Sequence, residues 1–163
     1  MALAATLSAC KQRRDSAPRA ELPPGALMTY GGGGGLTGKV SRMTVFADGR
    51  VEGTESGRPT PPVHVPITRI EKLAVDLAST GVFTQKDGTW APSRPVPDGS
   101  GAELIVRDKA GAVHAYHSET GATAPAVVER AIQVAGAFAS EVEGQHLRTP
   151  CACQPGDPLC SCL

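Results

Sequence analysis

The stretch VSRMTVFADGRVEGT, residues 40–54, decides the fold because it predicts a tight β-hairpin. Two runs rich in apolar and β-branched residues, 40–47 and 50–54, flank the dipeptide Asp48-Gly49. Asp-Gly between two such runs is a strong local signal for a turn that joins antiparallel strands. The chain is therefore predicted to contain an antiparallel sheet, to which the neighbouring segments add strands or helices.

The segment before this hairpin combines a short apolar run with glycines. The run ALMTY, residues 26–30, predicts a strand, and five consecutive glycines follow it from Gly31 to Gly35. Glycines lose more backbone entropy on folding than other residues, so such a run is expected as a loop or where backbone must lie against something. A phosphate-binding loop is disfavoured, because Gly38-Lys39 is followed by Val40 and not by a Ser or Thr that opens a helix. We expect a glycine-rich hairpin loop.

The segment after the hairpin predicts an irregular crossing and then a helix. Residues 55–66 are rich in proline and are expected to form no regular element. Thr68 and Glu71 match a capping box at the start of a helix, and Gly81 stands where a C-terminal cap is expected. The apolar stripe of this helix is Ile70, Leu73, Ala74 and Leu77.

Residues 84–101 contain several prolines and glycines and predict a long loop without secondary structure. Loops of this length in small domains are often functional. Trp90 lies in this loop either as a lid over the core or as an exposed contact residue, and we favour the lid.

A second hairpin is predicted from residues 102–107 and 112–117, with two alternative registers. A two-residue loop places Val106 opposite Val113, whereas a turn with a glycine bulge at Gly111 places His114 opposite Val106. In either register His114 and His117 point to opposite faces of the strand, because side chains alternate along a strand. The two imidazoles are therefore not expected to share a metal ion.

The last predicted element is a helix opened by Pro125 and ended by Gly144. Its apolar face is Val128, Ala131, Ala135, Phe138 and Val142. The predicted order is strand, strand, strand, helix, strand, strand, helix. This order indicates an α+β domain over residues 26–144, with a small, mostly antiparallel sheet of about five strands and two helices on one face.

The beginning of the chain resembles a bacterial lipoprotein signal. Leu7-Ser8-Ala9-Cys10 matches the lipobox at each of its four positions, and Cys10 is the expected lipid-carrying residue. Residues 1–9 are apolar but form a shorter signal than usual and lack its basic start, so the true start could lie upstream or the match could be accidental. Residues 10–25 are expected to be a flexible tether. The resemblance implies an acylated protein of the cell envelope, anchored to the bacterial membrane and facing the periplasm or the exterior.

The end of the chain, residues 145–163, is predicted to be a cysteine-rich tail. Two Cys-x-Cys pairs, Cys151 with Cys153 and Cys160 with Cys162, lie on either side of a Pro-Gly-Asp-Pro turn. Outside the cytoplasm these four thiols are expected to form disulfides between the pairs, because a bridge within a Cys-x-Cys pair is strained. Four thiolates at this spacing could alternatively bind zinc or copper.

The order of motifs in residues 27–140 resembles emfourin, a small protein inhibitor of thermolysin-type metalloproteases. The motifs are Gly34-Gly35-Leu36-Thr37-Gly38, Asp48-Gly49, Thr80-Gly81-Val82-Phe83, Pro97-Asp98, the second hairpin and the helix opened by Pro125. Gly33 stands where the glycine motif of the family has a serine. The resemblance implies a partner-binding site at Gly34, Gly35, Leu36, Thr37 and Gly38, to which the loop with Trp90 could contribute.

Composition and motifs narrow the function. The formal net charge is +0 and the basic residues are scattered, which disfavours nucleic-acid binding. No nucleophile elbow or metal-binding helix motif is present, so we expect neither catalysis nor a cofactor. The favoured function is a lipid-anchored envelope protein that binds another protein, with a thermolysin-type metalloprotease as the implied target. The alternatives are a metal-binding or redox-active lipoprotein that acts through its tail, and a structural envelope lipoprotein.

Overall fold

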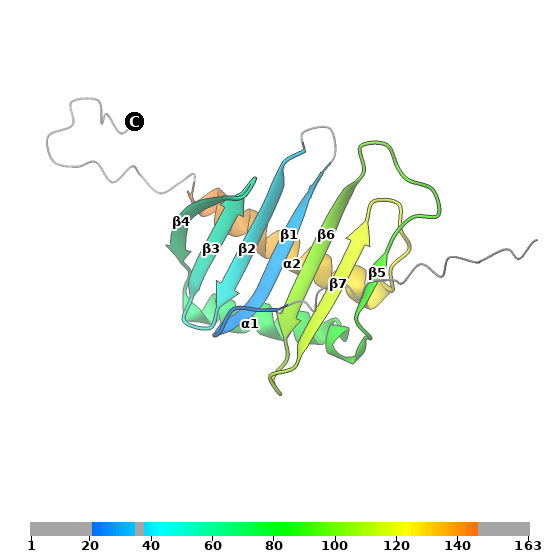
Figure 1. The fold of residues 1–163 in the computed structure, drawn as a ribbon. Coiled ribbons are helices and arrows are strands. Elements are labelled where there is room, and N and C mark those ends of the chain that lie inside the picture. Colours follow the sequence, from blue (N-terminus) through cyan, green and yellow to red (C-terminus); the bar gives the residue numbers. More distant parts are fainter. Residues whose placement is uncertain (1–20, 35–37, 147–163) are drawn as a thin grey trace, which may run out of the picture.

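The computed structural model describes residues 21–34 and 38–146, which form one seven-stranded sheet with two long helices on one of its faces (Figure 1). The strands are β1 (Ala26–Gly34), β2 (Val40–Phe46), β3 (Arg50–Glu55), β4 (Arg58–His64), β5 (Gly88–Trp90), β6 (Ser100–Arg107) and β7 (Val113–Glu119). The helices are α1 (Ile67–Ser79), the short 3-10 helix η2 (Val82–Thr84) and α2 (Ala126–His146). The strand order is β4-β3-β2-β1-β6-β7-β5, and every pair is antiparallel except β5 with β7.

The predicted α+β class with a mostly antiparallel sheet is confirmed, but the predicted strand count was too low. The two additional strands are β4 and β5, and both lie at edges of the sheet. Neither helix in the described part of the chain is long and apolar enough to cross a membrane.

Both predicted hairpins are present, and they close in the same way. Gly49 donates its backbone N–H to the carbonyl oxygen of Phe46 (3.1 Å), and Gly111 donates to that of Asp108 (3.1 Å). Each of these glycines has a left-handed backbone, with φ of 88° at Gly49 and 87° at Gly111. This is the geometry of a turn followed by a glycine bulge, and it adds one residue to a two-residue loop.

The glycine bulge sets the register of the second hairpin. Val106 pairs with His114 and Leu104 pairs with Tyr116, so the register with a bulge at Gly111 is correct and the two-residue loop is wrong. His114 and Tyr116 therefore point toward the helices, while His117 points to the opposite face, as the alternation of side chains predicted.

The glycine run forms a strand where we expected a loop. Gly31 to Gly34 continue β1. Gly31 to Gly33 pair with β2 on one side, and all four glycines pair with β6 on the other. Hydrogen bonds from two neighbouring strands compensate the entropy that these glycines lose on folding. The prediction of a hairpin loop was therefore wrong for Gly31 to Gly34, and Gly38 lies in the connection that follows.

The proline-rich segment also forms a strand where we expected an irregular crossing. In β4, Pro59 pairs with Thr54, and the register shifts between the pairs of β3 residues Val51 and Gly53. Pro61 and Pro62 lie at this irregularity. A proline cannot donate to a ladder, but an edge strand with a bulge needs fewer donors than a central strand.

The helices differ from the prediction at their ends. α1 begins after Pro66, whose carbonyl oxygen accepts from Arg69, and no side chain caps it, so the capping box of Thr68 and Glu71 is not formed. Gly81 follows α1 with a φ of 81°, which confirms the predicted C-terminal glycine. α2 continues past Gly144 to His146, so Gly144 does not end it.

The covered face of the sheet holds the main core. The predicted apolar faces of α1 and α2 pack there, except that Ala74 is exposed. The core residues from the strands include Met28, Val45, Leu104, Val106 and Tyr116. The segment 84–101 is not one loop, because β5 and the start of β6 lie within it. Trp90 of β5 is half-buried and stacks on Tyr116 with ring centroids 6.5 Å apart, as the lid interpretation expected.

Candidate functional site

The open face of the sheet, which the helices do not cover, carries side chains in rows that run across the strands. One row, which we call the charged row, consists of Arg42 on β2, Gly31 on β1, Glu103 on β6 and His117 on β7. The next row toward the loops, the glycine row, consists of Val40, Gly33, Gly101 and Glu119 on the same four strands. Residues two apart on a strand share a face, so both rows lie on the open face.

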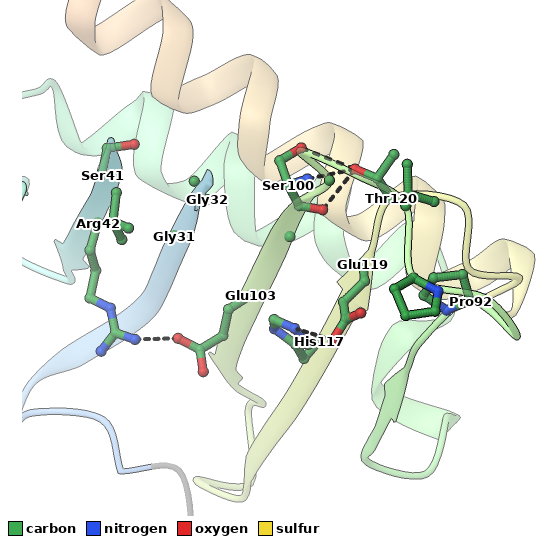
Figure 2. A pocket seen from close by; sticks show the side chains of 16 residues that line it. Gly31, Gly32, Ser41, Arg42, Pro92, Ser100, Glu103, His117, Glu119 and Thr120 are labelled. Carbon is green, nitrogen blue, oxygen red and sulfur yellow. Dashed lines mark hydrogen bonds and ion pairs between the residues drawn. The ribbon is translucent and has the colours of Figure 1, made fainter. Parts of the chain in front are cut away.

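In the charged row, Arg42 reaches across Gly31 to Glu103. The Nη2 atom of Arg42 donates to Oε2 of Glu103, and the two side chains lie flat on the sheet (Figure 2). A Cβ atom at Gly31 would lie 3.7 Å from Nε of Arg42, which is an ordinary contact distance, and glycine leaves this position open beneath the Arg42 side chain. The ion pair joins strands that are not neighbours.

In the glycine row, two neighbouring positions in the middle of the sheet have no side chain. Gly33 and Gly101 pair directly, between Val40 on one side and Glu119 on the other. The imidazole of His117 leans over Gly101, with its Cε1 atom 3.1 Å from where a Cβ atom of Gly101 would lie. Nε2 of His117 lies 3.9 Å from Oε1 of Glu119. The floor of this row therefore has no side chain of its own at Gly33 and Gly101, but the imidazole of His117 covers Gly101.

A groove of about 500 Å³ lies over these rows, and we call it the glycine groove. Its floor is formed by the central strands, and one wall is formed by the segment between β5 and β6. The lining residues are Gly31, Gly32, Gly33, Val40, Ser41, Arg42, Pro92, Pro95, Val96, Gly99, Ser100, Gly101, Glu103, His117, Glu119 and Thr120.

The wall between β5 and β6 has a defined conformation. Gly99 donates its N–H to the carbonyl oxygen of Val96 (3.0 Å), and Asp98 between them has a φ of 56°. The Cγ2 atom of Val96 packs 3.0 Å from where a Cβ atom of Gly121 would lie, so the segment rests on the connection between β7 and α2. The carbonyl oxygen of Gly99 lies at the same distance from the corresponding point at Gly34. The wall is thus held against the end of β1.

Hydroxyl groups fix the end of the groove that is nearest the wall. The N–H of Ser100 donates to Oγ1 of Thr120 (3.1 Å), and Oγ1 of Thr120 donates to the carbonyl oxygen of Ser100 (2.7 Å; Figure 2). These bonds join the start of β6 to the residue after β7. The side chain of Thr120 therefore helps to fix this end of the groove.

Two exposed aliphatic side chains flank the glycine groove. Val40 is 54% exposed and Val96 is 42% exposed, and both belong to the small set of large hydrophobic side chains that are exposed in the described residues. They stand on opposite sides of the groove, on β2 and on the wall. Exposed apolar side chains beside polar groups suit contact with another protein.

A second groove, of about 780 Å³, lies on the covered face between α2 and the strands β1 to β4. Met43, Val63 and Ala139 line it, together with Tyr30 and Glu143. Burial raises the pKa of the Tyr30 hydroxyl, and the nearby carboxylate of Glu143 raises it further.

The predicted contact residues are only partly brought together. Gly34 lies at the end of β1 beside the glycine groove, and Gly38 has a φ of 59° in the connection before β2. Trp90 lies on the covered face, so its side chain is not part of the groove. The remaining predicted site residues lie outside the described residues: Cys10, Gly35, Leu36, Thr37, Cys151, Cys153, Cys160 and Cys162.

Sequence reasoning missed the charged residues of the groove. Arg42 and Glu103 lie within strands that the sequence predicts and Glu119 lies beyond them, but no local pattern marks these residues as a site. His117 was considered only as a metal ligand. Register was the signal that could have found them, since the bulge at Gly111 alone places Glu103 opposite His117.

The groove offers carboxylates, a guanidinium group, an imidazole and exposed backbone, which are groups that bind polar parts of a partner. In residues 21–34 and 38–146, no group of three or more His, Cys, Asp or Glu side chains is arranged to hold a metal ion. No protein-family model matches this chain, and no similar protein is found among the curated proteins. The resemblance to emfourin therefore rests on the order and spacing of its motifs alone.

Proposed function

We propose that this chain is a non-catalytic protein-binding module of the bacterial cell envelope, and that its contact surface is the glycine groove with the two segments beside it. A thermolysin-type metalloprotease is the first partner to test, because the motif order resembles that of an inhibitor of such enzymes. In this proposal the bound protein is inhibited because its active-site cleft is occupied.

One observation carries the proposal. The two segments that the sequence singled out for contact, 31–38 and 84–101, are far apart in the chain, but parts of both lie at one end of the sheet (Figure 1). Gly31 to Gly33 of the first segment and Pro92 to Gly101 of the second line the same groove. A shared surface of this kind can contact one partner with both segments at once.

The chemistry of the surface supports protein binding. The absence of side chains at Gly33 and Gly101 lets a partner approach the sheet closely once the imidazole of His117, which leans over Gly101, moves aside. Val40 and Val96 offer apolar contact on either side, and the charged row adds polar groups at the border. Interfaces commonly combine an apolar centre with a polar rim and backbone contacts.

Titration of a thermolysin-type protease with the full chain carrying Cys10→Ala tests the proposal. We expect inhibition at micromolar concentrations and direct binding in calorimetry. Gly101→Val should weaken both, since its side chain would fill the groove next to His117, which can move. Gly144→Ala is the matched control, because a Cβ atom there meets nothing within 4 Å. If the protein with the unsubstituted groove neither inhibits nor binds the metalloprotease, the metalloprotease is refuted as the partner.

The proposed location depends on Cys10, which lies outside the described residues. Cells fed a fatty-acid analogue should label the wild-type protein and not the Cys10→Ala variant. Equal labelling of the two proteins, or none of either, would remove the lipid anchor from the proposal while leaving the groove untouched.

A further inference from the structure

We propose that the glycine row is a receptor for an arginine side chain of the partner protein, with Glu119 as its principal acceptor. The inference rests on the proposed function, since it names the group that a bound protein places in the glycine groove. It rests on a comparison of the two rows. In both rows glycine lies next to a glutamate, but only the charged row has an arginine.

The charged row shows how this sheet holds a guanidinium group. Arg42 crosses the bare backbone at Gly31, and its head meets the carboxylate of Glu103 on the far side (Figure 2). Its side chain is 52% exposed and that of Glu103 is 33% exposed, so the pair lies on the surface but is sheltered on one side by the sheet. A planar guanidinium group suits this position because it can lie flat on peptide planes and donate from its edge.

The glycine row repeats this pattern without its cation. Gly33 and Gly101 provide the bare backbone and Glu119 provides a carboxylate at the end, but Val40 stands on β2 where the charged row has Arg42. Within the described residues, the ion-pair contact of Glu119 is with His117, at 3.9 Å, and no Lys or Arg pairs with it. Its side chain is 48% exposed and can accept from outside.

The walls of the groove match the rest of an arginine side chain. Long basic side chains pack their methylene groups on apolar surface while the charged head stays polar. Val40 and Val96 flank the floor, and Glu103, which already pairs with Arg42, lies beside the head. The glycine row spans one strand more than the space that Arg42 crosses, and Val40 supplies no cation, so we assign the cation to the partner.

Amide shifts of the isotope-labelled full chain carrying Cys10→Ala provide the test. The probe is N-acetylargininamide, and N-acetylcitrullinamide is its neutral control of nearly equal shape. We expect the arginine probe to shift the amides of Gly33 and Gly101 at millimolar concentrations, and the citrulline probe to bind up to roughly five-fold more weakly, as expected for loss of the positive charge from an exposed ion pair. Equal binding of both probes, or shifts confined to other parts of the chain, would overturn the inference.

Two variants extend the test to the acceptor and the floor. Glu119→Gln should weaken the arginine probe by up to roughly five-fold, and Gly101→Val should block it, while Gly144→Ala should bind as the unsubstituted chain does. Glu119→Gln changes one exposed group, so the fold is expected to persist and its amide spectrum checks this. An unchanged affinity in Glu119→Gln would refute the assigned acceptor.

The outcomes separate this inference from the proposed function. If a metalloprotease is inhibited and Glu119→Gln inhibits it equally well, the protein-binding proposal stands and the arginine receptor is wrong. If no metalloprotease binds but the arginine probe depends on Glu119, the receptor stands and the partner must be another protein that presents an arginine.

Discussion

The covered face and the open face of the sheet belong to the same strands but carry different kinds of side chain. Leu104 and Glu103 are neighbours in β6, yet Leu104 is fully buried under the helices while Glu103 reaches toward Arg42 on the surface. The covered face is closely packed with aliphatic side chains and Tyr116, whereas the open face near the loops has glycines where side chains would otherwise project.

Because of this difference, we expect the covered face to determine the stability of the fold and the open face to determine recognition of a partner. Apolar burial supplies most of the free energy of folding, and here the larger core lies on the covered face. The open face has a smaller cluster of Leu22, Ala26, Phe46 and Ile105, and it lies at the end of the strands away from the glycine groove. The exposed charged side chains of the groove, such as Arg42 and Glu103, can therefore change with little effect on the fold.

The largest effect is expected from a pair of substitutions at neighbouring positions. Leu104→Ala should lower the free energy of unfolding by about 2–5 kcal/mol, because it leaves a cavity in the core. Glu103→Gln should change it by less than about 1 kcal/mol, because it breaks only an exposed ion pair. Urea unfolding followed by the fluorescence of Trp90 measures both. Comparable losses in the two variants would contradict the division of roles between the faces.

A smaller effect is expected from the polar group inside the covered face. The hydroxyl of Tyr116 donates to the carbonyl oxygens of Val82 (2.8 Å) and Gln85 (3.1 Å), which ties η2 to β7. Tyr116→Phe should cost about 1–2 kcal/mol, since it removes both of these hydrogen bonds and leaves Val82 only the N–H of Gln85 as a donor. Hydrogen exchange should become faster in residues 82–90 and stay the same in β1. Unchanged exchange in 82–90 would show that the hydroxyl does not hold this segment.

Alkaline titration sharpens the comparison further, because both tyrosines of the chain face the covered side. Burial raises the pKa of Tyr116 to about 12, with a smaller contribution from Asp87, and the pKa of Tyr30 is also raised. The fold therefore favours the neutral phenol. This stabilisation is fully present below pH of about 10 and is lost as the pH rises through about 12.

In the folded protein, the ultraviolet absorbance of phenolate should accordingly rise at a higher pH than in the urea-unfolded chain. Tyr116→Phe should leave only the titration of Tyr30. A phenolate signal that develops at the ordinary pKa in the folded protein would mean that water reaches these side chains.

The smallest effect on stability is expected on the open face. Arg42→Gln should lower the free energy of unfolding by less than about 1 kcal/mol, because the guanidinium group is half-exposed and its ion pair is screened by salt. The same urea titration measures this change at low and high salt. A loss of several kcal/mol would show that the charged row belongs to the structural core and is not free to vary.

Much of the covered face could be predicted from the sequence because its signals are local. The spacing of Leu73, Leu77, Val128 and Ala135 predicted the two helix faces, and Asp48-Gly49 predicted the first hairpin. Each signal involves residues within a few turns of one another. The α+β class follows from such signals alone.

The rest depends on pairings that no local pattern contains. The glycines of β1 look like a loop until strands on both sides supply their hydrogen bonds, and the prolines of β4 look irregular until the strand is placed at an edge. The rows of the open face require the register of four strands at once. Gly111 determines part of this register, but only the assembled sheet brings Arg42 and Glu103 together.

The two edge strands of the sheet have a consequence for how molecules of this chain associate in solution. The outermost strand on one side, β4, carries three prolines, and on the other side β5 has only three residues. Unprotected borders let sheets join into fibrils, and a border that lacks amide hydrogens or length resists such joining. Concentrated preparations should therefore resist amyloid growth, and a Pro61→Thr, Pro62→Thr double variant should bind an amyloid dye sooner than the parent.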